Sequence, residues 1–110
     1  MEQPNIVFIT THELGRHLRC YGARSVRSSN LDALATRRVR FEQVFCVAPQ
    51  CSSARAALAA GRYPHANGVM GLAHGEFAWH LPTTETHVAQ YLKDKGYDTA
   101  LFGLQPEFRQ

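Results

Sequence analysis

The short apolar run "NIVFIT" at residues 5–10 constrains the fold more than any other feature of the sequence. Its hydrophobic residues follow one another without alternation, which is typical of a parallel strand covered on both faces. Further along the chain, periodicity predicts helices at 28–38, 52–60 and 83–96 and strands at 39–45 and 97–103. This order predicts an α/β fold, with a mostly parallel sheet flanked by helices.

Local signals mark the ends of the expected helices. Ser28 or Ser29 is expected to cap the first helix, Gly61 to end the second, and a threonine to cap the third. Residues 63–82 are rich in Pro, Gly and Asn and are expected to form a long loop. Three histidines of this loop could face a ligand or be ordinary polar loop residues: His65, His74 and His80.

The composition excludes several classes of protein. The chain has 110 residues, so it holds at most about one domain. Its net charge of +3 suits an anionic ligand, but no aromatic interleaving or known module accompanies the arginines, so we expect no nucleic-acid partner.

No apolar run approaches the ~20 residues of a membrane span, and we expect no membrane partner. No signal peptide is evident, which predicts a cytoplasmic chain as given; a periplasmic location stays open if a leader precedes it.

The cysteines do not suggest a disulfide scaffold. There are three of them, Cys20, Cys46 and Cys51, and both the odd number and the wide spacing argue against paired bridges. No CxxC or HxxxH pair supports a zinc site that would combine His12 and His17 with Cys20 and Cys46.

Cys51 stands out because it begins the stretch "CSSARAALAAGRYPH" at 51–65. If Cys51 or Ser52 caps a helix over 53–60, the thiol lies where backbone N–H groups and the helix dipole favour negative charge. Arg55, one turn later, could share that face and hold an anion in a bidentate pair. The residues alone leave two interpretations open: a nucleophile beside an oxyanion cradle, or a structural cysteine before an ordinary helix.

A family resemblance favours the first interpretation. "CSSAR" fits the Cys-x-[Pro/Ala/Ser]-x-Arg signature of the formylglycine-dependent, type I sulfatases. The segments "PNIVFI", "SNLDALATRRVRF", "ALAAGRYPH" and "GYDTALFG" resemble that family in the same order. The loop "GRYPHANGVMGL" most resembles the branch of heparan N-sulfatase-like bacterial enzymes. The resemblance implies that residues 1–110 are the N-terminal, incomplete portion of a sulfatase catalytic domain with the alkaline-phosphatase-like fold.

The resemblance also implies a chemistry. A formylglycine-generating enzyme would oxidise Cys51 to formylglycine, whose hydrate would attack the sulfur of a sulfate ester or an N-sulfate. The substrate would be a sulfated small molecule or carbohydrate, and the residues that bind it are not identified. Arg55 would hold the charge of the hydrate. A divalent metal, with calcium the first expectation, would polarise the sulfate and would be held by His12, Glu13 and the modified Cys51.

The sequence departs from the family pattern in two places. His12 and Glu13 stand where two aspartates are usual, and an imidazole weakens the case for calcium or points to another metal. Leu104 and Pro106 stand where the family has a lysine and a histidine. We therefore expect the chain to be inactive by itself. Two alternatives stay open: a phosphonate or phosphodiester hydrolase of the same superfamily, and a catalytically dead remnant that binds anions.

Overall fold

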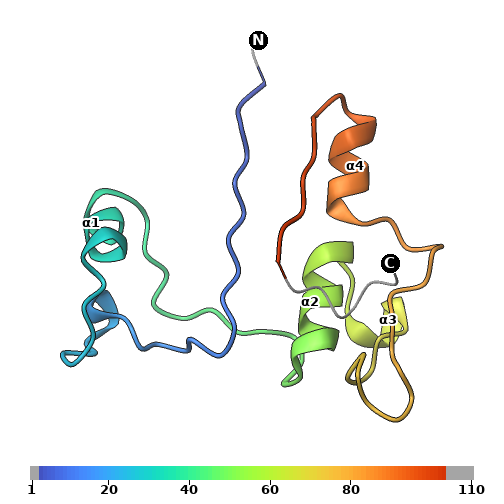
Figure 1. The fold of residues 1–110 in the computed structure, drawn as a ribbon, viewed down its shortest axis with the longest axis horizontal. Coiled ribbons are helices and arrows are strands. Elements are labelled where there is room, and N and C mark those ends of the chain that lie inside the picture. Colours follow the sequence, from blue (N-terminus) through green and yellow to red (C-terminus); the bar gives the residue numbers. More distant parts are fainter. Residues whose placement is uncertain (1–2, 104–110) are drawn as a thin grey trace. The chain divides into compact units, whose positions relative to one another are not determined.

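The computed structural model describes residues 3–103, and its elements are helices joined by irregular segments (Figure 1). The chain divides into two compact units, Met1–Gln43 and Val44–Gln110. No helix within the described residues is long and apolar enough to cross a membrane. The helices are, in order, the 3₁₀ helix η1 (Arg19–Tyr21) and the α-helices α1 (Ser29–Arg37), α2 (Cys51–Ala60), α3 (Pro64–Asn67) and α4 (Val88–Asp94).

The first unit is held together where α1 meets η1. The carboxylate of Asp32, on α1, accepts a hydrogen bond from the Cys20 N–H at 2.8 Å and another from the Ser28 hydroxyl at 3.0 Å. The Ser28 hydroxyl in turn accepts from the Arg19 N–H at 2.9 Å. Ser28 is the N-cap of α1, as expected, but its hydroxyl makes no capping bond to the helix. The serine joins the two helices instead.

An aromatic and cationic cluster connects η1 to the segment expected to be a strand at 39–45. The guanidinium carbons of Arg16 and Arg40 lie 5.1 and 5.5 Å from the centroid of the Tyr21 ring, within the range of cation–π attraction. Both arginines pair with Glu42, and the Tyr21 hydroxyl donates to the Phe41 carbonyl at 3.0 Å. Side-chain contacts therefore fix the backbone of residues 40–42 against η1.

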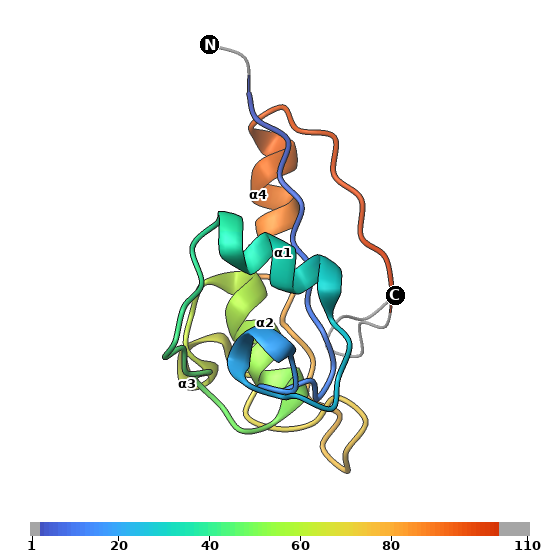
Figure 2. The same ribbon diagram turned by 90° about the vertical axis from the view of Figure 1, so that its left-hand side faces the viewer.

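The second unit is built around α2, which packs against α3 and α4 (Figure 1 and Figure 2). Its small core contains Ala56 and Val69, both fully buried, together with Ala57 and Ala73. Gly61 ends α2 as expected, with a φ of 64° and its N–H donating to the Ala57 carbonyl. The left-handed backbone at this position favours glycine.

The third predicted helix is shorter than expected. The sequence predicts a helix over 83–96 with a threonine cap, but α4 begins at Val88 and its N-cap is His87. The preceding residues form a turn in which the Glu85 N–H donates to the Pro82 carbonyl at 3.0 Å. The Glu85 side chain, only 11% exposed, is paired with Arg62 just after α2. Residues 83–86 thus lie before the helix, and Glu85 has its ion-pair partner outside it.

None of the three predicted strands is present as a strand within residues 3–103. Residues 5–10 form an extended segment (Figure 1). Within it, Val7, Phe8 and Ile9 are 82%, 71% and 82% exposed. A strand requires hydrogen bonds to a neighbouring strand, and an isolated extended segment has none to make. The prediction of a parallel sheet is therefore not confirmed by the described residues.

The cap of α4 predicts a pH dependence of stability. The Nδ1 atom of His87 accepts a hydrogen bond from the Ala89 N–H at 2.9 Å, and only a deprotonated nitrogen can accept. Burial lowers the pKa of His87 below its usual value of 6.5, so the unfolded chain binds this proton more readily than the folded chain. The contribution to stability is therefore fully present above pH 6.5 and is lost as the pH falls through the lowered, folded-state pKa.

His87→Asn should remove this part of the pH dependence, because asparagine can cap a helix without titrating in this range. Urea unfolding of both proteins at about pH 7.5 and about pH 5.5 isolates the contribution of His87, since every other titrating group is common to the pair. An equal loss of stability in both proteins on acidification would contradict this prediction.

Candidate functional site

The residue predicted to be the nucleophile is the first residue of α2. The sequence predicts a cap at Cys51 or Ser52, and this is wrong, because the N-cap is Gln50, whose backbone is extended with φ −102° and ψ 140°. The Ala54 N–H donates to the Gln50 carbonyl at 3.0 Å and starts the hydrogen-bond ladder of the helix. Cys51 is half-buried and lies inside the first turn.

This position gives Cys51 the electrostatic surroundings that the sequence suggested. The first N–H groups of any α-helix have no acceptor within the helix, and together with the dipole they attract negative charge. Arg55 is one turn further along α2, half-buried, and i, i+4 residues lie on the same helix face. An oxyanion formed at Cys51 would therefore meet backbone N–H groups, with a guanidinium on the same side of the helix.

The two hydroxyls that follow Cys51 have structural partners. Ser52 is fully buried, and its hydroxyl accepts a hydrogen bond from the Ala73 N–H at 3.0 Å. Ser53, 2% exposed, donates to the Gln50 carbonyl at 3.2 Å. Ser52 therefore fastens the loop after α3 to the first turn of α2, and Ser53 closes that turn on itself.

The loop fastened by Ser52 is compact and depends on a glycine. The Gly75 and Trp79 N–H groups both donate to the Leu72 carbonyl, at 3.1 and 3.4 Å. A Cβ atom at Gly71 would lie 2.7 Å from the Trp79 indole, so the ring occupies the space that any other side chain would need. This contact was not predicted, because its two residues are eight positions apart in a stretch without periodicity.

The three loop histidines have different surroundings. His74 is exposed, and His65, also exposed, has its ring stacked on that of Tyr63 with the centroids 5.7 Å apart. The Nδ1 atom of His80 is buried and has no hydrogen-bond partner within the described residues. Within the described residues, none of the three forms a hydrogen bond with Cys51.

The two predicted metal ligands of the first unit are neighbours in space as in sequence. The Nε2 atom of His12 lies 3.7 Å from a carboxylate oxygen of Glu13, and the two side chains are 61% and 85% exposed. In the part of the chain that the structure describes, no three His, Cys, Asp or Glu side chains gather in a way that could hold a metal ion. Cys51, the third predicted ligand, belongs to the other unit. One imidazole and one carboxylate do not make a calcium site, which takes six to eight oxygens.

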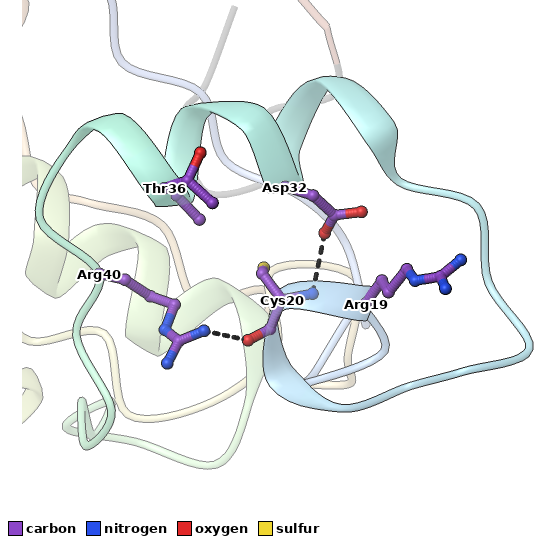
Figure 3. A pocket seen from close by; sticks show the side chains of 6 residues that line it. Arg19, Cys20, Asp32, Thr36 and Arg40 are labelled. Atoms are coloured by element: carbon purple, nitrogen blue, oxygen red, sulfur yellow. Dashed lines mark hydrogen bonds between the residues drawn. The ribbon is translucent and has the colours of Figure 1, made fainter.

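A cavity of about 550 Å³ lies in the first unit between η1 and α1 (Figure 3). Two of its three charged side chains hold the unit together: Asp32 accepts from the Cys20 N–H, and the Arg40 guanidinium donates to the Cys20 carbonyl and pairs with Glu42. The arrangement explains how η1, α1 and the 40–42 segment hold together. Cys20, which lines this cavity, lacks the signature that surrounds Cys51.

Comparison with known proteins decides the family. The model of the family described as Sulfatase matches residues 4–108. The chain belongs to the sulfatase family. This confirms the resemblance found in the sequence, and it implies the alkaline-phosphatase-like α/β fold for the complete domain. No solved structure matches the chain.

Several sulfatases are similar to this chain. Human arylsulfatase H is 39% identical in an alignment of 109 positions that covers 92% of this chain and 19% of the relative. Human steryl-sulfatase is 38% identical in an alignment of 108 positions that covers 92% of this chain and 18% of the relative. The N-acetylgalactosamine-6-O-sulfatase of Bacteroides thetaiotaomicron is 32% identical over 103 residues, 93% of this chain and 20% of the relative. The chain thus spans about a fifth of the length of these curated relatives.

The two serines of the signature should differ in their importance for stability. Ser52→Ala leaves the buried Ala73 N–H without an acceptor, which should lower the free energy of unfolding by about 1–3 kcal/mol. Ser53→Ala is the matched control, since the Gln50 carbonyl keeps its bond from the Ala54 N–H, and the loss should stay below about 1 kcal/mol. Both variants keep the family signature. Urea unfolding measures the two effects, and a larger loss for Ser53→Ala would contradict the assignment.

Proposed function

We propose that the protein to which these residues belong is a sulfatase that hydrolyses sulfate esters with a formylglycine made from Cys51. The observation that carries the proposal is the place of Cys51. In a chain of the sulfatase family, the cysteine of the "CSSAR" signature is the first residue of a ten-residue helix, with Arg55 one turn behind it.

The residues of α2 have separate roles in this proposal. Formylglycine, once formed at position 51, supplies a hydrated aldehyde oxygen as the nucleophile for sulfur. The N-terminal end of α2 favours the negative charge that this oxygen carries during attack. Arg55, one turn further along α2, would stabilise the same charge. Ser52 and Ser53 act as positioning residues in this proposal, because their hydroxyls bind the Ala73 N–H and the Gln50 carbonyl.

The substrate proposal follows the relatives. By their names, the similar proteins act on aryl sulfates, on steryl sulfates and on the 6-O-sulfate of N-acetylgalactosamine. We propose that the substrate is a sulfate ester of a small molecule or carbohydrate. An N-sulfate is the alternative substrate, because the 61–72 loop resembles that of heparan N-sulfatase-like enzymes. Rates for matched sulfate and phosphate esters on a complete homologous chain would separate this proposal from the phosphonate and phosphodiester alternative. Retained sulfate binding without turnover would instead mark a catalytically dead anion binder.

Cys51 should be converted to formylglycine, while Cys46 should not. Trypsin releases both cysteines in one peptide, residues 41–55, so Cys46 serves as an internal control. The chain is co-expressed with a formylglycine-generating enzyme, and the peptide is sequenced by tandem mass spectrometry. Arg55→Ala breaks the signature and should abolish the conversion; this variant is read in the longer peptide 41–62. Intact thiol at Cys51, while a control sulfatase is converted in the same cells, would contradict the proposal.

Conversion should not be sufficient for catalysis by residues 1–110 alone. Leu104 and Pro106 lie outside the described residues, and neither side chain can donate a proton to a leaving oxygen. A general acid contributes typically ~10²–10⁴-fold. We expect the converted chain to hydrolyse an aryl sulfate no faster than Cys51→Ala does, and multiple turnovers that vanish in that variant would contradict this.

His12 and Glu13 should bind a divalent cation weakly. The pair offers one imidazole nitrogen and one carboxylate, which suits a transition metal such as zinc better than calcium. Titration calorimetry with each ion should show binding that disappears when His12 and Glu13 are both replaced by Ala. His17→Ala removes another exposed imidazole nearby in the sequence and is the matched control. Binding that survives in the double variant would place the cation elsewhere.

A further inference from the structure

The cavity of about 550 Å³ between η1 and α1 has no part in the proposed mechanism. We call it the η1–α1 cavity. Its volume falls within the ~300–1,000 Å³ of pockets that hold small organic molecules. The cavity belongs to the first unit and Cys51 to the second. A ligand of this cavity is therefore a question separate from the chemistry at position 51.

The positive charge of the chain is confined to the unit that contains this cavity. Residues 1–43 have seven arginines and four acidic side chains, which gives a net charge of +3. Residues 44–110 have five basic and five acidic side chains, so their charges cancel. A surplus of positive charge raises the local concentration of anions. The first unit therefore favours an anionic ligand.

Three charged side chains line the η1–α1 cavity: Arg19, Asp32 and Arg40. The Arg40 guanidinium is held by Glu42 and by the Cys20 carbonyl. Arg19 differs, because within the described residues its guanidinium has no hydrogen-bond or ion-pair partner, and the residue is exposed. Figure 3 shows Arg19 and Arg40 on opposite sides of Cys20. Among the charged groups of the lining, Arg19 is therefore the one available to a ligand.

The charge of the lining selects the charge of the ligand. Two guanidinium groups and the Asp32 carboxylate give the lining a net charge of +1. A carboxylate carries −1 and matches it, and its two oxygens suit the planar fork of a guanidinium. A phosphate monoester carries about −1.5 to −2 at neutral pH, and the excess charge would face Asp32 without a partner. The lining therefore favours a carboxylate.

The uncharged part of the lining comes from Cys20, Ala35 and Thr36. The Thr36 hydroxyl donates to the Ala33 carbonyl at 2.9 Å, so its proton is not available to an oxyanion. The methyl groups of Ala35 and Thr36 and the Cys20 thiol offer apolar surface to the body of a ligand. The attraction for an anion is thus concentrated at Arg19.

We propose that the η1–α1 cavity binds a small organic acid, whose carboxylate pairs with Arg19 and whose apolar body lies against Ala35 and Thr36. No step of the proposed sulfate chemistry requires such a ligand. The cavity is thus a further binding site, and the proposal stands or falls without the formylglycine mechanism.

Alkylation of Cys20 reports on the occupancy of this site, because its sulfur lies on the side of η1 that faces α1 (Figure 3). The 110-residue chain is exposed to iodoacetamide, an uncharged reagent, and the tryptic peptide 20–24 is quantified by mass spectrometry. Benzoate at about 10 mM should slow the reaction about tenfold if its Kd is about 1 mM. Cys46 is exposed, belongs to the other unit and should keep its rate.

Three probes of similar size separate the possible ligands: benzoate, the uncharged benzyl alcohol and the dianionic phenyl phosphate. Sodium chloride keeps the ionic strength constant. Protection of Cys20 should be strongest with benzoate. Equal protection by benzyl alcohol would show an apolar crevice without an anion site, and stronger protection by phenyl phosphate would contradict the charge match. Either result overturns the inference, as does an unchanged rate at about 10 mM benzoate.

Arg19→Ala should weaken the protection by benzoate about tenfold, the loss expected for one hydrogen-bonded charge pair. Its side chain is exposed, so this change should leave the fold intact. Arg24→Ala is the matched control, because it removes the same charge from an exposed arginine of the same unit that does not line the cavity. The two variants are read in the peptides 17–24 and 20–27. Undiminished protection in Arg19→Ala, or an equal loss in both variants, would overturn the assignment to Arg19.

Discussion

The buried hydrogen bond between the Ala73 N–H and the Ser52 hydroxyl governs the second unit, because it joins the first turn of α2 to a loop 21 residues later. A buried donor that loses its acceptor costs about 1–3 kcal/mol, so the helix start and the loop are stable only together. The core residues Ala56 and Val69 lie between these two points in the sequence, and both are fully buried. The residue proposed to carry the chemistry, Cys51, thus adjoins the most constrained contact of its unit. A nucleophile benefits from such restraint, since attack requires a fixed geometry.

The sequence was a good guide wherever the deciding interactions are local. The alanine-rich run and Gly61 located α2 and its end, because helix propensity and a left-handed cap act within a few residues. The apolar residues of 83–96 located α4, but not its start at Val88, and Glu85 instead pairs with Arg62, 23 positions away. The cap of α2 was wrong by one or two residues, since Gln50 and neither Cys51 nor Ser52 is the N-cap. The bond from the Ala73 N–H to Ser52 was not predicted either, because it joins residues 21 positions apart.

The strands show the limit of this kind of prediction. An apolar run such as 5–10 predicts a strand that is buried on both faces. It does not identify the segments that pack against those faces. Helix hydrogen bonds form within one segment, whereas a parallel strand depends on partners a dozen or more residues away. In residues 3–103 the side chains of Val7 and Phe8 stay largely exposed, as do those of Phe45 and Phe102. Family membership rests on the match over residues 4–108, whereas no strand is present within residues 3–103.

The burial of the signature has a consequence for the order of events in the proposed maturation. Ser52 and Ser53 are 0% and 2% exposed, and both are part of a hydrogen-bonded helical turn. A modifying enzyme that reads Cys-x-[Pro/Ala/Ser]-x-Arg must reach the cysteine, the small third residue and the arginine, and α2 presents only the half-buried Cys51 and Arg55. Unwinding the first turn would break the bond to Ala73 and open the core at Ala56 and Ala57. The oxidation of Cys51 therefore precedes the formation of α2 in this proposal. The contacts that later position the modified residue therefore also end the access of the modifying enzyme to Cys51.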